Sequence, residues 1–101
     1  MPNYQLGKIY KLVCDENDDV YVGSTAQPYL SNRFAGHKSA YKCYQKGKGG
    51  FKSAFIMLQH PTVRIELIEH YPCDSHYELL AREGYWVKNT ACVNKNVCIA
   101  P

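Results

Sequence analysis

The fold is decided by two short stretches near the start of the chain, Gly7-Lys8-Ile9-Tyr10 and Tyr21-Val22-Gly23-Ser24-Thr25. Between them stands the acidic run Asp15-Glu16-Asn17-Asp18-Asp19. Such a run indicates a turn, because Asp and Asn side chains bond their own backbone and tolerate tight turns. The pattern therefore predicts a hairpin with strands over residues 7–14 and 19–24.

The same hairpin predicts where two tyrosines lie. A hairpin whose loop has an even number of residues places Tyr10 and Tyr21 on the same sheet face, because side chains alternate with period two. Two phenols on one exposed face are more polar aromatic surface than a plain core needs. We therefore expect this face to form the floor of a functional site.

Length and composition favour one small globular domain over residues 1–101. The chain is 46% apolar and 21% charged, which is typical of soluble domains and argues against disorder. It contains no apolar run near the roughly 18 residues of a membrane span, and its start lacks the apolar core of a signal peptide. Five cysteines form an odd set, so we expect reduced thiols and an intracellular protein, cytoplasmic or nuclear rather than secreted.

Charge is segregated along the chain although the net charge is only +3. The segment from Val20 to Ile65 contains no Asp or Glu. A segregated basic segment indicates a surface that faces a polyanion. The alternative is a solvated, lysine-rich helix face. The residues that we expect to contact this polyanion are Lys38, Lys42, Lys46, Lys48 and Lys52.

Two helices are predicted after the hairpin. The first runs over about 28–45, with Ser24 or Thr25 as its N-cap and Pro28 in its first turn. It ends at the glycine-rich stretch 46–50, because glycine is unfavourable in a helix. A short amphipathic helix follows and ends before Pro61.

A third strand and a third helix complete the expected domain. Apolar and polar residues alternate over 63–71, which predicts a strand with one covered face. Ser75 and Glu78 form a capping-box pattern at the start of a helix over about 75–88. A short tail is expected to pack back on the sheet. The expected fold is α+β, a small three-stranded antiparallel sheet flanked by helices in the order β-β-α-α-β-α.

Glu83, Arg33 and His37 are the residues best placed for chemistry. Glu83 shares a helical stripe with Leu79 and Trp86, and a carboxylate among apolar neighbours needs a cation, a metal or a proton. Arg33 and His37 are four residues apart and share a helix face, where they can bind phosphate and relay a proton. The alternatives are a glutamate at the solvent edge or paired with an arginine such as Arg82, and an ordinary exposed Arg–His pair.

A zinc site is a weaker prediction. Its ligands would be Cys73, His76, Cys92 and Cys98, but their spacing is irregular and the sequence has no Cys-x-x-Cys pair. A zinc-stabilised interaction domain is therefore the least favoured class of function.

Taken together, these residues resemble the GIY-YIG nuclease family. Five segments occur in the family order over about residues 6–97, and nearly the whole chain is covered. The motif residues are Lys8-Ile9-Tyr10, Tyr21-Val22-Gly23, Arg33 with His37, Glu83 in Arg82-Glu83-Gly84-Tyr85-Trp86-Val87, and Asn94 in Cys92-Val93-Asn94-Lys95.

The resemblance implies both an activity and roles for these residues. The activity is metal-dependent hydrolysis of a DNA phosphodiester, with one Mg²⁺ or Mn²⁺ held by Glu83. Arg33 would contact the phosphate, Tyr10 would activate or hold the water, and His37 would take the proton onward or contact phosphate. Tyr21 would orient the water or contact phosphate, although which tyrosine is the base stays open. Asn94 would position backbone or substrate, with Asn96 as its rival.

The resemblance also leaves the source of specificity open. Because the catalytic domain fills the chain, selectivity for a DNA sequence or structure is expected to come from the core, from a homo-oligomer or from a protein partner. No membrane partner is expected. The alternative function is a catalytically inactive nucleic-acid-binding module of the same fold.

Overall fold

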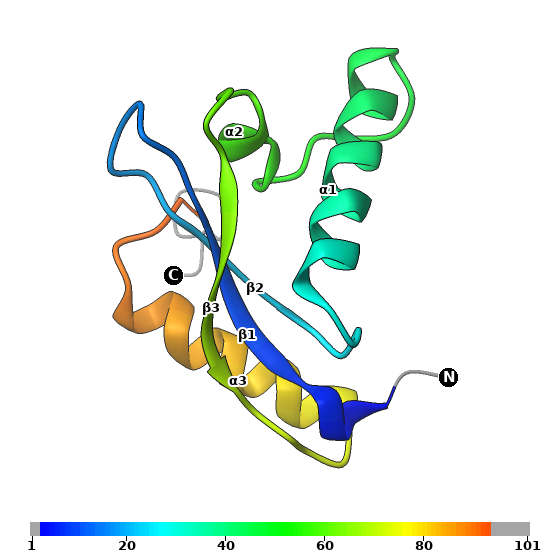
Figure 1. The fold of residues 1–101 in the computed structure, drawn as a ribbon, viewed down its shortest axis with the longest axis vertical. Helices are drawn as coiled ribbons and strands as arrows, with labels where there is room; N and C mark the ends of the chain where they lie inside the picture. The colour runs from blue at the N-terminus through cyan, green and yellow to red at the C-terminus, as the bar shows by residue number, and fades with distance from the viewer. Residues whose placement is uncertain (1–2, 94–101) are drawn as a thin grey trace.

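A computed structural model of the chain describes residues 3–93. It contains a three-stranded antiparallel sheet in the order β2-β1-β3, with α1 and α2 over one face and α3 over the other (Figure 1). This architecture confirms the predicted α+β fold and element order. Between residues 3 and 93, no helix has the length and apolar character needed to cross a membrane. The elements are η1 (Tyr4–Leu6), β1 (Lys8–Val13), β2 (Tyr21–Thr25), α1 (Leu30–Gln45), α2 (Phe55–Leu58), β3 (Arg64–His70) and α3 (His76–Asn89).

The pairing of β1 with β2 places the two tyrosines as predicted. Tyr10 lies opposite Gly23 and Leu12 lies opposite Tyr21, so both tyrosines share one sheet face. The expectation that this face is exposed was wrong. It packs against α1 and α2, and Tyr10 is completely buried there. The core on this side consists of Tyr10, Leu12, Cys14, Ala54, Met57 and Val93.

The opposite face of the sheet carries a second core under α3. Ile9 and Val22 pack there against Leu79, together with Cys73 and Cys92. Trp86 and Val87 of α3 pack on this cluster from outside. The domain therefore has three layers, which are α1 with α2, the sheet, and α3.

Strand β3 departs from the simple alternation predicted for it. A register shift between Ile9 and Tyr10 places Ile9 opposite Glu69 but Tyr10 opposite Leu67. An extra residue of this kind turns the side chains that follow to the other face. Glu69 consequently faces α3, where it accepts hydrogen bonds from Arg82 and from the Trp86 indole, the latter at 2.8 Å. Leu67 is left 41% exposed on the edge strand.

The predicted N-cap of the first helix was also wrong. Strand β2 continues through Thr25, and α1 begins only at Leu30, with Tyr29 as an N-cap that makes no side-chain hydrogen bond. Extended pairing with β1 therefore uses the residues that were expected to cap the helix.

At α3, Ser75 caps the helix as predicted. Its hydroxyl accepts from the Glu78 backbone N–H at 3.3 Å. The reciprocal partner differs, because Glu78 accepts from the backbone N–H of Asp74 at 3.1 Å. The tail is described only as far as Val93, whose N–H donates to the Val20 carbonyl at 2.7 Å.

Candidate active site

The Tyr10 hydroxyl is the centre of a hydrogen-bonded group between β1 and α1. It lies 2.7 Å from Nε2 of His37, and Nε of Arg33 donates to it at 3.1 Å. The Tyr21 ring meets the His37 ring edge-on, with centroids 5.9 Å apart. Arg33 and His37 reach the sheet together because residues four apart lie on one helix face. Two strands and one helix thus bring four of the expected site residues together.

Gly23 makes room for the Tyr10 ring. A Cβ on Gly23 would lie 2.5 Å from Cζ of Tyr10, which is closer than side-chain atoms can approach. Gly23 stands directly opposite Tyr10 in the register, and the tyrosine ring occupies the space above this glycine. Close approach to another group is one of the uses of glycine in a strand.

We expect Gly23→Ala to destabilise the domain by about 1–3 kcal/mol, which is the usual cost of overpacking a core. The added methyl group must displace the Tyr10 ring and with it the hydrogen bonds to Arg33 and His37. Urea unfolding of the variant measures the loss. Gly36→Ala is the matched control, because nothing lies within 4 Å of the Cβ that it would add. Equal stability of the two variants would contradict the close packing of Tyr10 on β2.

The protonation states follow from burial and from Arg33. Burial, with a smaller contribution from the positive charges of Arg33 and Lys52, lowers the pKa of His37 to about 4. Burial raises the pKa of the Tyr10 hydroxyl, although Arg33 opposes this effect. At neutral pH, His37 is therefore a neutral imidazole and Tyr10 a neutral phenol. Because Arg33 can only donate to the Tyr10 oxygen, the phenol hydrogen is best placed on the line to Nε2 of His37.

The lowered pKa of His37 predicts that the free energy of unfolding falls at acid pH. The unfolded chain protonates this histidine near its ordinary pKa of 6.5, whereas the folded chain does so only near 4. The unfolded state therefore binds more protons between these values, and stability falls as the pH drops through this window. At pH 4.5 the loss from His37 amounts to about 2.5 kcal/mol.

Urea unfolding at pH 7 and pH 4.5 tests this, with the wild type and the His37→Gln variant compared. The difference between the two pH values should be smaller in His37→Gln, because glutamine does not titrate. His70→Gln is the control, since His70 is exposed at the end of β3. An equal acid loss in all three proteins would show that His37 is not held neutral by burial.

Glu83 approaches the group from the other layer. It lies on α3, half-buried between Leu79 and Trp86, as its helical stripe predicted. The Ser24 hydroxyl donates to its Oε1 at 2.5 Å, and its negative charge raises the pKa of Tyr10. Arg82 is not its partner, because that guanidinium pairs with Glu69. Within residues 3–93 the hydrogen bonding of this carboxylate uses Oε1, so Oε2 remains as a hard oxygen ligand.

A cleft is bordered by residues from both the Tyr10 group and the Ser24–Glu83 pair. Its volume is about 260 Å³, and Arg33 and Ser24 both line it. The remaining lining comes from Tyr4 of η1, from the end of β2 and the loop after it, and from the first turns of α3, including Gln27 and His76. The arginine that bonds Tyr10 and the serine that bonds Glu83 thus border one space. A group bound in this cleft could contact the Arg33 guanidinium and lie near the Glu83 carboxylate.

Comparison with protein families matches residues 6–96 to the model of the GIY-YIG catalytic domain. The chain belongs to the GIY-YIG family. Comparison with curated proteins and with solved structures found no match. Membership of this family identifies the chain as a nuclease domain and nucleic acid as its class of substrate.

In this GIY-YIG domain, most of the site residues predicted from sequence lie within the described part of the chain. Arg33 and His37 both bond the Tyr10 hydroxyl, and Tyr21 packs against His37. Glu83 bonds Ser24, which borders the same cleft as Arg33. Asn94 and its rival Asn96 lie outside the described residues. The five lysines are exposed on α1 and on the loop after it.

Two contributors to the GIY-YIG site were missed from the sequence. Ser24 was expected to cap a helix, yet it bonds Glu83. The signal was available in the period of β2, which turns Ser24 to the same face as Val22. Lys52 was expected only as a DNA contact, but its charge also helps to keep His37 neutral. No local pattern predicts that proximity, because Lys52 follows a glycine-rich turn whose path the sequence does not specify.

The predicted zinc ligands do not form a metal site among the described residues. The thiol of Cys73 donates to the backbone carbonyls of Tyr4 and Ser75, at 3.7 and 3.5 Å. Its clustering with His76 and Cys92 is not observed between residues 3 and 93. Cys98 lies outside the described residues. Cys14, Cys43, Cys73 and Cys92 are all free thiols, as expected.

Proposed function

We propose that this domain is a Mg²⁺-dependent endonuclease that hydrolyses phosphodiester bonds of DNA. The observation that carries the proposal is the Tyr10 hydroxyl, held between the guanidinium of Arg33 and the neutral imidazole of His37. A phenol in this position can accept a proton on its oxygen while it gives its own to Nε2. Together with the half-buried Glu83, this arrangement suits hydrolysis of a phosphate ester better than binding alone.

The residues act in the following order in the proposed reaction. Arg33 binds a non-bridging oxygen of the scissile phosphate and stabilises its charge in the transition state. Tyr10 accepts a proton from the attacking water and passes its own proton to His37, so no free phenolate is required. The edge of the Tyr21 ring keeps the His37 imidazole in place. Because a bound phosphate offsets the charge of Arg33, it also makes His37 a better proton acceptor.

Glu83 is the residue proposed to hold the divalent cation. One carboxylate whose Oε2 makes no hydrogen bond to residues 3–93, beside a serine hydroxyl, fits Mg²⁺, which binds through one or two carboxylates and keeps several waters. A bound Mg²⁺ supplies charge neutralisation at the phosphate and at the leaving oxygen. Ser24 fixes the rotamer of Glu83 so that Oε2 is presented in a defined direction.

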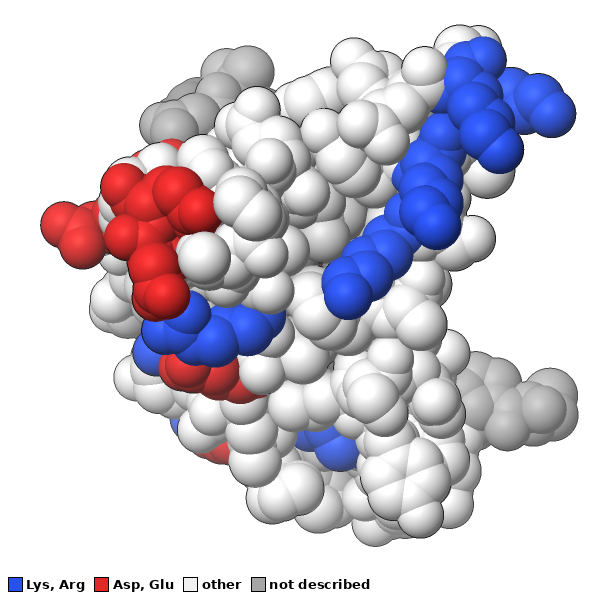
Figure 2. All heavy atoms as spheres, turned by 45° about the horizontal axis from the view of Figure 1, so that its top comes forward, with Lys and Arg blue, Asp and Glu red and all other residues white. Residues whose placement is uncertain are grey.

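The surface of α1 supports DNA as the substrate. Figure 2 shows basic side chains in a row along one side of the molecule and acidic side chains gathered on the other. Arg64, the remaining cation of the acid-free segment, is neutralised by Asp15 and Glu66. Within the acid-free segment, the exposed and unneutralised cationic surface is therefore formed by the lysines of α1 and its following loop, next to the helix residues Arg33 and His37.

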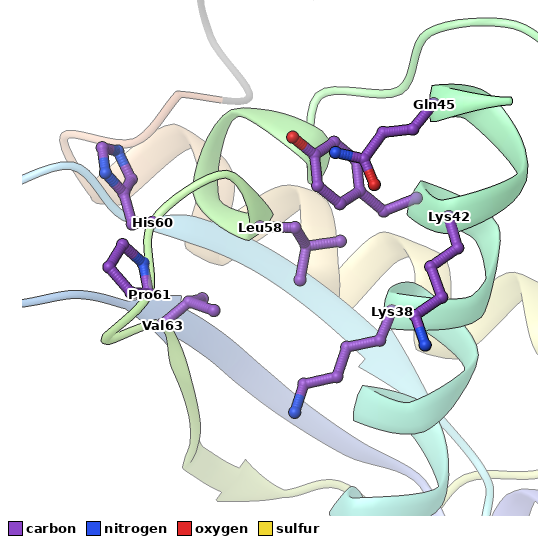
Figure 3. Close-up of a pocket in the computed structure, with 8 residues that line it drawn as sticks. Lys38, Lys42, Gln45, Leu58, His60, Pro61 and Val63 are labelled. Atoms are coloured by element: carbon purple, nitrogen blue, oxygen red, sulfur yellow. The ribbon is translucent and has the colours of Figure 1, made fainter. Parts of the chain in front are cut away.

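A groove runs beside this lysine row. It has a volume of about 260 Å³ and lies between α1 and the turn that leads into β3 (Figure 3). Lys38 and Lys42 border it on α1, and Leu58, Pro61 and Val63 form its apolar side. A groove with cations on one wall and apolar surface on the other suits a sugar–phosphate backbone with its bases. We propose that DNA extends from the Arg33 cleft along this groove.

Neutralising the row should lower the salt dependence of DNA binding. In a variant with Lys38→Gln, Lys42→Gln and Lys46→Gln, we expect the slope of log affinity against log salt to fall by about 2–3, since each phosphate contact contributes about 0.9. Binding of a labelled duplex at several salt concentrations measures the slope, without metal so that no cleavage occurs. Arg64→Gln is the control and should leave it unchanged. An unaltered slope in the triple variant would place the DNA elsewhere.

The activity itself is tested on supercoiled plasmid and on branched and flapped duplexes, with Mg²⁺ and with EDTA. The proposal predicts cleavage that needs Mg²⁺, and mapping of the cuts shows whether the enzyme nicks, cuts both strands at a sequence or recognises a junction. Intact substrates in every condition, with tight binding retained, would refute the proposed activity.

The alternative is a nucleic-acid-binding module without cleavage. One observation favours it: Tyr10, the residue proposed to meet the attacking water, is 0% exposed. The nuclease proposal requires that its hydroxyl be reached through the Arg33 cleft when DNA binds. Binding without cleavage on all the substrates above would establish the alternative.

A further inference from the structure

A second group of metal-ligating side chains lies at the other end of β1. Cys14 follows the strand, Glu16 belongs to the acidic hairpin loop, and His60 comes from the connection between α2 and β3. Their ligand atoms all lie within 4.8 Å of one another. None of these residues belongs to the group around Tyr10 or to the Ser24–Glu83 pair, although His60 also lines the lysine groove.

The three residues are held in place by their surroundings. Cys14 is 7% exposed and packs in the core under α2, and its thiol donates to Asn17 Oδ1 at 3.4 Å. The Thr62 hydroxyl donates to the Glu16 carboxylate and accepts from the Asp15 backbone N–H at 2.7 Å. A hydrogen bond to a ligating carboxylate is a usual feature around metal sites.

His60 has a defined backbone as well. Its N–H donates to the Met57 carbonyl at 3.1 Å, and its carbonyl accepts from Val63 at 3.2 Å. Figure 3 shows its ring pointing away from Lys38 and Lys42 of the groove. The imidazole is thus turned from the basic wall and can meet the hairpin loop.

We propose that Cys14, Glu16 and His60 form a zinc site with a water as fourth ligand. Thiolate, imidazole and carboxylate are all zinc ligands, whereas a thiol has little affinity for Mg²⁺. Binding exchanges the Cys14 S–H proton for the metal, and one proton is released. The ion would tie the hairpin loop to the turn before β3, at the far end of the lysine groove. The site lies about 16 Å along β1 from the Ser24–Glu83 pair, since a strand rises about 3.3 Å per residue.

The test uses the full chain, reduced and stripped of metal with EDTA. Co²⁺ is added as a spectroscopic probe, and Zn²⁺ is then added to displace it. The proposal predicts a thiolate-to-cobalt absorption and the visible bands of tetrahedral Co²⁺, both abolished by one equivalent of Zn²⁺. It also predicts a higher melting temperature with Zn²⁺, because a ligand that binds only the folded state stabilises it.

Variants assign the signal to these residues. Cys14→Ser should remove the thiolate absorption, and His60→Gln and Glu16→Gln should weaken Zn²⁺ binding by roughly tenfold or more. The two latter variants keep the test decisive if Cys14→Ser fails to fold, since Glu16 is exposed. Cys43→Ser is the control, because this exposed thiol lies outside the proposed site, and it should bind as the wild type does. Absence of Co²⁺ absorption, or absorption that survives in His60→Gln and Glu16→Gln at unchanged affinity, would overturn the proposal.

Discussion

Replacement of Glu83 by alanine should abolish Mg²⁺-dependent cleavage while DNA binding is largely retained. Glu83 is the half-buried carboxylate that Ser24 holds through Oε1. Stabilisation of charge by a metal is worth several kcal/mol, and each 1.36 kcal/mol is a factor of ten in rate. We therefore expect the single-turnover rate to fall by roughly a thousandfold or more.

Two comparisons make the Glu83 result specific. Glu66→Ala removes a carboxylate of β3 that pairs with Lys11 of β1 and with Arg64, and the variant should cleave at the wild-type rate. The melting temperature of Glu83→Ala shows whether the fold is intact. Turnover at the wild-type rate in folded Glu83→Ala would eliminate this residue as the metal ligand.

The second large effect is expected from Arg33→Ala. Loss of one preorganised donor to a developing oxyanion costs about 2.7–4 kcal/mol, which is a factor of about 10²–10³ in rate. Arg33 has a further role, because its charge and its hydrogen bond hold the pKa of Tyr10 lower than burial alone would. The variant should therefore show a pH–rate profile displaced to higher pH as well as a lower rate. Single-turnover cleavage across the pH range measures both.

The controls for Arg33 separate charge from geometry. Arg33→Lys keeps the charge but loses the planar fork and its bond to the Tyr10 hydroxyl, so we expect only partial recovery. Arg64→Ala removes an arginine that is paired with Asp15 and Glu66 and should have no effect on cleavage. An undiminished rate in Arg33→Ala would refute its role at the phosphate.

Most of the fold could be predicted because its signals are local. The turn residues between Tyr10 and Tyr21 predict the hairpin. An even number of loop residues then places both tyrosines on one sheet face, whatever the exact register. The bulge in β3 could not be predicted, since it depends on how Glu69 meets Arg82 and Trp86 of α3. The start of α1 was predicted too early because strand pairing with β1 carries β2 through Thr25.

The candidate site was predictable in its members and less so in its environment. Helical spacing places Arg33 with His37 and gives Glu83 a half-buried position. Nothing in the sequence shows that Tyr10 is wholly buried or that Ser24 bonds Glu83 of α3. The same limit applies to Cys14, Glu16 and His60, because only the packing of the hairpin against the turn before β3 brings His60 to the other two.

The central claim is that the reaction takes place where Arg33, Tyr10 and Glu83 meet, with the catalytic cation on Glu83. The most direct test is an anomalous difference map from a crystal of the protein with a DNA duplex and Mn²⁺. We predict a peak about 2.1 Å from a Glu83 carboxylate oxygen, with a DNA phosphate between it and the Arg33 guanidinium. A phosphate and Mn²⁺ bound together at another site, with neither at Glu83 nor at Arg33, would contradict the account.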